Sequence, residues 1–166
     1  AKTVFTFGGL TSVQNDAATK VTSSYTPSQS GTLYALCTAG QYTYTYNANG
    51  ATSGSPSAST GSYTTGGTAI TLISQGTLGK TGYTFNGWST TQNDDTTKIM
   101  NSGSLTISAP AIFYALWTAV NYSVSYSVSD AVSGTAPSDS GNYNISQSAA
   151  VKANTGNLAK TGYTFN

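Results

Sequence analysis

The chain has 166 residues and carries little charge: six Lys and five Asp give a net charge of +1, and charged residues make up 7% of it. Because His is absent, no Ser–His–Asp or Cys–His catalytic set can form, and we expect no enzyme activity, cofactor or metal centre. So small a net charge offers no footprint for nucleic acid, and no apolar stretch approaches the roughly 18 residues of a membrane span.

A ten-residue segment recurs along the chain. It is complete at residues 80–89 (KTGYTFNGWS), altered at residues 2–11 and cut short at residues 160–166. The copies start 78 and 80 residues apart. A fixed period of this size indicates repeated structural units of about 80 residues, each large enough for a small core.

Residues 1–40 are expected to be the C-terminal half of a repeat. Val4, Phe5 and Phe7 lead into a Gly-Gly turn signal, and residues 32–37 form a short apolar run of strand length. Cys37 is the only cysteine and occupies the position that Trp117 has in the next repeat, so we predict a small buried hydrophobe and no disulfide.

Residues 41–119 are one complete repeat. Residues 41–47 alternate Tyr with Thr, which predicts a half-buried strand with Tyr42, Tyr44 and Tyr46 on one face. An Asn-Gly turn follows at 49–50. The Ser- and Gly-rich residues 51–67 are predicted to be a loop or irregular edge, and residues 68–73 a second strand.

The recurring segment itself predicts a strand with a defect. Tyr83 and Phe85 share a face by alternation, which leaves Trp88 on the opposite one. We predict a bulge or sharp bend at Gly87 that turns Trp88 back towards the core. Residues 94–100 are predicted to contain a short helical turn. Residues 104–108 and 112–117 are predicted strands, the last of them central because it is apolar on both faces.

Residues 120–166 are expected to be the N-terminal half of the next repeat, with apolar residues alternating with Ser over 122–128. The joints between repeats are short and lack Gly/Ser runs, which predicts a semi-rigid rod. Their residues are Thr38, Ala39 and Gly40 at the first joint and Thr118, Ala119 and Val120 at the second.

Two chemical alternatives remain open. Asn93, Asp94 and Asp95 offer oxygen ligands to Ca²⁺, but three ligands fall short of the six to eight that the ion takes, so a solvated loop is the simpler interpretation. Each copy of the recurring segment starts with a Lys, at positions 2, 80 and 160, which precedes the expected strand. We interpret these lysines as edge-protecting or snorkelling side chains, with an intramolecular isopeptide bond as the alternative.

The complete repeat resembles the Listeria–Bacteroides repeat, the internalin B-repeat type, in residues 42–50, 80–89 and 113–117. The resemblance implies a compact β-grasp-like unit, mainly β with some α, found in tandem in secreted and surface proteins of bacteria that are not enzymes. The residues that carry the structural signature are Lys80, Gly82, Tyr83, Phe85, Gly87, Trp88, Tyr114, Leu116 and Trp117.

From this we expect a structural repeat module of an extracellular stalk, fibre or filament, on the bacterial cell surface or secreted. Its expected partners are neighbouring repeats or copies of itself, head to tail. The alternative is an adhesion module that binds a host protein or glycan through its Ser and Thr faces. The half-repeats at the two ends indicate either a window of a continuous polymer, which we favour, or chains that complete each other by strand addition.

Overall fold

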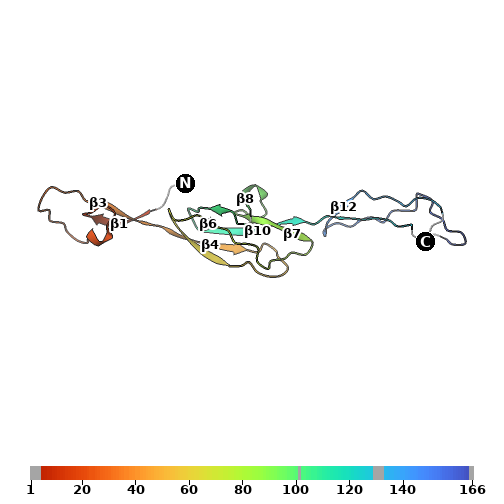
Figure 1. The fold of residues 1–166 in the computed structure, drawn as a ribbon, viewed down its shortest axis with the longest axis horizontal. Coiled ribbons are helices and arrows are strands. Elements are labelled where there is room, and N and C mark those ends of the chain that lie inside the picture. Colours follow the sequence, from red (N-terminus) through yellow and green to blue (C-terminus); the bar gives the residue numbers. More distant parts are fainter. Residues whose placement is uncertain (1–4, 101, 129–132, 165–166) are drawn as a thin grey trace.

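A computed structural model describes residues 5–100, 102–128 and 133–164, so Lys2, Val4, Phe165 and Asn166 lie outside the described residues. The molecule is elongated, and three parts follow one another along its long axis: residues 5–39, residues 41–119 and residues 121–164 (Figure 1). The fold is mainly β. Among the described residues the helical elements are two 3₁₀ turns and no α-helix, so the α part of the expected α+β unit is not present there.

The first part is a three-stranded antiparallel sheet of order β2-β1-β3. Its strands are β1 (Phe5–Thr11), β2 (Lys20–Val21) and β3 (Tyr34–Ala39), with the 3₁₀ turn η1 (Ala17–Thr19) before β2. The pairing of β1 with β3 slips by one residue between Phe7 and Gly9, where Gly9 has φ 131°. The first part therefore contains a β-bulge of its own.

The central part is a five-stranded mixed sheet of order β5-β4-β10-β7-β8. Its strands are β4 (Gln41–Asn47), β5 (Thr60–Thr64), β7 (Tyr83–Ser89), β8 (Lys98–Ile99) and β10 (Ala111–Ala119). β10 is central as predicted, parallel to β4 and antiparallel to β7. A separate pair joins β6 (Ile70–Thr71) to β9 (Ser104–Leu105), and the 3₁₀ turn η2 (Asp95–Thr97) confirms the predicted helical turn.

The core of the central part joins residues from its front half, which contains β4 to β6, and its back half, which contains β7 to β10. Trp88 and Phe113 are fully buried, and Tyr46 of β4 packs against both rings, with centroids 4.7 and 5.4 Å apart. The other members of the buried cluster are Tyr63, Ile70, Leu72, Leu78 and Ala115. Aromatic packing between β4, β7 and β10 is thus what holds the two halves of the repeat together.

The structure confirms some of the predicted strands and changes the bounds of others. The alternating strand at 41–47 is confirmed, with Tyr42 and Tyr44 half-buried and Tyr46 buried. Residues 51–67 are not all loop, because they contain the edge strand β5 with its buried Tyr63. The strands predicted at 68–73 and 104–108 shrink to the two-residue β6 and β9.

The third part is a short antiparallel pair, β11 (Tyr122–Ser123) with β12 (Asn142–Tyr143). The alternation over 122–128 predicts a longer strand than the structure contains. Tyr122 is 53% exposed, whereas its counterpart Tyr42 in the complete repeat is half-buried. Alternation alone therefore does not make a strand where no neighbour takes up the backbone hydrogen bonds.

The same local structures recur at the sequence period. The β1–β3 pairing runs from Phe5↔Ala39 to Thr11↔Tyr34, and the β7–β10 pairing runs from Tyr83↔Ala119 to Ser89↔Tyr114 with the slip at the same place. The isolated bridge Ser53↔Gly79 likewise returns as Ser133↔Ala159. The first part thus matches the back half of the central unit, and the third part matches its front half.

Cys37 is exposed, which contradicts the prediction of a buried residue. Its counterpart Trp117 is half-buried because its indole reaches across to Ala48 in the front half of the same unit. Residues 5–39 have no such front half beside them among the described residues, so nothing covers the thiol. The prediction assumed that equivalent positions have equivalent surroundings.

Candidate functional site

A tight turn leads into β7, which we call the signature strand because it contains most of the recurring segment. Gly82 has φ 74°, a conformation that favours glycine, and the Tyr83 N–H donates to the Lys80 carbonyl at 3.0 Å. The Lys80 ammonium lies 4.5 Å from the centre of the Tyr83 ring, a cation–π contact. Lys160 and Tyr163 repeat this contact at 4.6 Å. At both of these positions the Lys thus lies over the first aromatic residue of the recurring segment.

The predicted defect in this strand is confirmed. Gly87 has φ 123°, and the pairing of β7 with β10 slips beside it, between Leu116 and Trp117. Trp88 beyond the bulge is fully buried, and its indole N–H donates to the Ile73 carbonyl at 2.8 Å. The bulge therefore reorients Trp88 so that its indole bonds the front half of the unit.

The closing strand β10 contributes a second bond of this kind. The indole N–H of Trp117 donates to the Ala48 carbonyl at 3.1 Å, and its ring meets Phe85 edge-on at 5.7 Å. Leu116 is buried at 3% exposure, and Tyr114 is half-buried and pairs with Ser89. The structure thus brings the predicted signature residues together in and beside one sheet, and two of them, Trp88 and Trp117, reach across to the front half of the repeat.

The first joint is a single residue between two strands. β3 includes Thr38 and Ala39, and β4 begins at Gln41, so Gly40 alone separates them. The Gly40 carbonyl accepts a hydrogen bond of 2.9 Å from the N–H of Thr65, just beyond β5. The backbone at this joint is therefore tied to the central unit.

The second joint makes contacts on both sides. Thr118 and Ala119 end β10, and the Val120 N–H donates to the Gly82 carbonyl at 2.9 Å. Ile145 of the third part lies against Gly82: a Cβ built on this glycine would be 2.8 Å from the Ile145 Cβ. No sequence motif marked Ile145, although it lies 80 residues after Thr65, whose N–H bonds the first joint.

Two of the acidic residues, Asp94 and Asp139, are engaged in local structure. Asp94 caps η2, and the Thr96 hydroxyl and backbone N–H that it accepts hold its pKa below the usual value. Asp139 accepts from the Gly141 N–H and the Tyr143 hydroxyl, which lowers the pKa of Asp139 and raises that of Tyr143. The described residues contain no cluster of three potential metal ligands from His, Cys, Asp and Glu.

The described part of the chain holds no helix of the length and apolarity that membrane crossing requires.

No curated protein matches the chain in a sequence search, and no solved structure matches it either. The family model of the Listeria-Bacteroides repeat domain matches residues 42–115, which begin in β4 and end within β10. The central sheet of this chain, with its bulged signature strand and closing β10, is therefore the part that is similar to the Listeria-Bacteroides repeat domain.

Proposed function

We propose that this chain is a structural segment of an extracellular bacterial surface protein, in which repeats follow one another as a semi-rigid stalk or fibre. The family supports a repeat module of surface proteins. The recurrence of the same strand pairing and bulge in residues 5–39 supports a tandem array. The strand order, with the first and last strands of the unit parallel at its centre, is in keeping with a β-grasp-like unit.

The observation that carries the mechanical role is the second joint. Val120 is hydrogen-bonded to Gly82, and the Ile145 side chain is packed on the same glycine. A joint with both a backbone bond and a side-chain contact resists bending more than a free linker of the same length. An extended array of such joints would transmit force and position whatever lies beyond it.

Adhesion through aromatic side chains has less support. Within the described residues of the central repeat, the large hydrophobic side chains classed as exposed are Met100 and Ile112, and neither is aromatic. Tyr42, Tyr44 and Tyr83 are half-buried, so each leaves only part of its ring open to a sugar. We also propose that the role is not enzymatic, because the acidic side chains at Asp94 and Asp139 serve local turns.

The test measures the stiffness of the second joint. In a Cys37→Ser background, spin labels at the exposed positions Thr45→Cys and Ser148→Cys report the distance from the central repeat to the third part. We expect one narrow distance distribution in pulsed electron resonance. The control inserts four Gly and Ser residues between Val120 and Asn121 and should broaden it. An equally broad distribution without the insertion would reject the semi-rigid stalk.

A further inference from the structure

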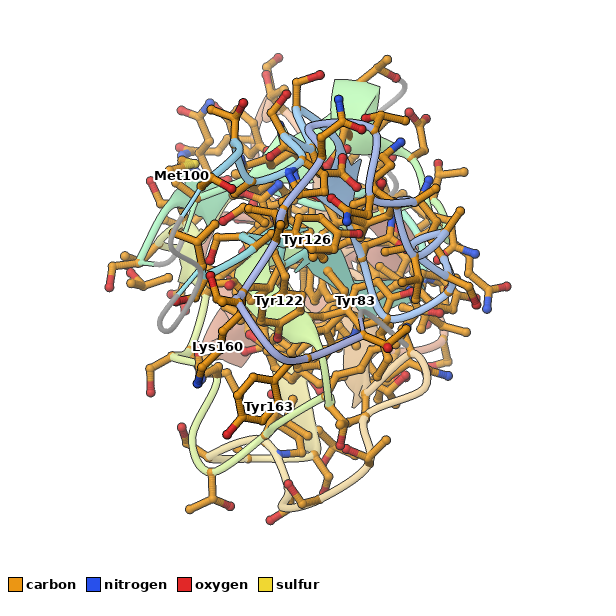
Figure 2. All side chains as sticks on the ribbon, turned by 90° about the vertical axis from the view of Figure 1, so that its right-hand side faces the viewer. Tyr83, Met100, Tyr122, Tyr126, Lys160 and Tyr163 are labelled. Carbon is orange, nitrogen blue, oxygen red and sulfur yellow. The ribbon has the colours of Figure 1, made fainter. Side chains whose placement is uncertain are left out.

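One lysine of the central unit is directed at an amide. The recurring Lys80 and Lys160 lie over Tyr rings, at 4.5 and 4.6 Å from the ring centres, and Figure 2 shows Lys160 beside Tyr163. Lys98 of β8 has a different partner: its Nζ donates to the Asn86 Oδ1 at 2.6 Å. An amine and an amide carbonyl therefore meet on neighbouring strands, β8 and β7.

The Asn86 amide is hydrogen-bonded on both sides. Its oxygen accepts from Lys98, and its nitrogen donates to the Asp95 Oδ1 at 3.4 Å. A cation at the oxygen draws electrons from the amide carbon, and a carboxylate at the nitrogen stands where a leaving group would take up protons. Lys98 and Asn86 are half-buried, and Asp95 is exposed. The three side chains thus supply a nucleophile, an electrophile and a group for proton transfer.

The backbone holds these three side chains together. Gly87 is the bulge glycine, and a Cβ built on it would lie 3.6 Å from the Lys98 Cγ, so the stem of Lys98 runs close over the bulge. The turn η2 ends at Lys98, whose backbone N–H donates to the Asp95 carbonyl. β8 in turn pairs Lys98 with Ser89 of the signature strand. The contact between Lys98 and Asn86 is therefore positioned by a bulge, a turn and a strand pair.

The first part keeps the lysine and lacks the other two groups. Lys20, 78 residues before Lys98, also lies over the bulge glycine of its unit, where a Cβ on Gly9 would be 2.8 Å from the Lys20 Cε. The places of the amide and the carboxylate are taken there by Gly8 and Ala17. The chain therefore contains its own comparison, a lysine in the same setting without an amide to attack.

We propose that Lys98 and Asn86 form an intramolecular isopeptide bond, with Asp95 as the group that transfers protons. The Lys98 amine attacks the Asn86 Cγ, so that the Nζ–Cγ bond forms and the Cγ–Nδ2 bond breaks. The protons that the Lys98 ammonium loses pass through Asp95 to Nδ2, which departs as ammonium. The chain loses one ammonia, about 17 Da, and no oxidant, reductant or second substrate takes part.

The bond would fasten a weakly held edge of the sheet. β8 has two residues and is the last strand in the order β5-β4-β10-β7-β8. A link from Asn86 to Lys98 closes the segment that contains η2 and reduces the number of open conformations available to it. This stabilisation lies within one unit and does not depend on the stalk role.

The test is the intact mass of the 166-residue chain, followed while the folded protein is incubated. We expect a mass about 17 Da below that of the sequence. Trypsin locates the bond, because it cleaves after a free Lys and not after an acylated one. Digestion of the denatured chain should leave residues 81–152 uncut at Lys98. A chain that keeps its full mass and is cleaved completely at Lys98 would overturn the proposal.

A competing reaction also releases ammonia. Asn86 precedes Gly87, and an Asn-Gly sequence can close to a succinimide. Lys98→Arg separates the two reactions, since Arg keeps the charge and the hydrogen-bond donors but its guanidinium does not form the amide. The mass deficit should disappear in this variant. A deficit that persists in Lys98→Arg, or one that leaves Lys98 cleavable in the unmodified chain, would assign the loss to the succinimide and refute the isopeptide bond.

Two further variants complete the experiment. Lys20→Arg is the matched control: it makes the same exchange over a bulge glycine without an amide opposite, and it should leave the mass deficit unchanged. Loss of the deficit in this control would contradict the assignment to Lys98. Asp95→Asn keeps the size of the side chain and should slow formation of the bond by about 100-fold, with the circular dichroism unchanged. An unchanged rate would contradict the role of Asp95 in proton transfer.

Discussion

Replacement of Trp88 by Leu tests whether the bulged strand holds the two halves of the repeat together. Trp88 is fully buried and donates to the Ile73 carbonyl at 2.8 Å. Loss of this bond, with the carbonyl left unpaired, costs about 1–2 kcal/mol. The space left beside Tyr46, whose ring centre is 4.7 Å away, adds about 1–2 kcal/mol. We expect Trp88→Leu to lower the free energy of unfolding by about 3 kcal/mol.

The assay is urea unfolding followed by far-UV circular dichroism and by the fluorescence of Trp117, the one indole that the variant retains. The control is Leu10→Ala, which truncates the equivalent position in the first part, where the side chain is already 39% exposed. Since Leu10 lies in another unit, the urea midpoint reported by Trp117 fluorescence should be the same in Leu10→Ala as in the unmodified chain. A loss below about 1 kcal/mol for Trp88→Leu, or an equal loss for the control, would refute this account of the core.

Two further predictions concern the joint and the third part. Gly82→Ala should destabilise the chain by about 1–2 kcal/mol in thermal unfolding, from its positive φ and the clash with Ile145. The clash component should disappear in the double variant with Ile145→Gly, which removes the Ile145 Cβ as well as its methyl groups, and additive effects would contradict the contact. Because the pKa of Asp139 is lowered, its ionised form stabilises the β11–β12 pair above the ordinary Asp pKa, and this stabilisation is lost as pH falls. Because the pKa of Tyr143 is raised, its protonated form stabilises the pair below the ordinary Tyr pKa of about 10, and this stabilisation is lost as pH rises. Nuclear magnetic resonance of the Gly141 amide should therefore show loosening at both extremes, and Asp139→Asn should abolish the acid limb.

Local pattern was enough to predict the features that depend on neighbouring residues in the sequence. The period-two alternation at 41–47 gave the buried face of β4. The conflict between that period and the position of Trp88 gave the bulge at Gly87. Both succeed because the strand's geometry constrains which residues share a face, and a large indole cannot remain in water without cost.

The strand β5 could not be found in this way, because its evidence is tertiary. Gly61 pairs with Tyr44, and a Cβ on this glycine would collide with the Tyr44 ring. A residue of low strand propensity is therefore required at this position of the strand. The Ser and Gly content of residues 51–67 is typical of a loop. Here, however, Gly61 leaves room for the aromatic ring of Tyr44 in the neighbouring strand β4.

The differences between the first part and the complete repeat follow a physical division. Gly9 keeps the bulge, and Thr11 keeps the buried hydroxyl that Ser89 has, bonding the carbonyl two residues on as Ser89 does. These contacts lie within one half of a repeat. The two lost tryptophans are instead the residues whose indoles cross to the other half. The first part has thus retained what stabilises its own sheet and lost the side-chain bonds that, in the central unit, tie the two halves of the repeat together.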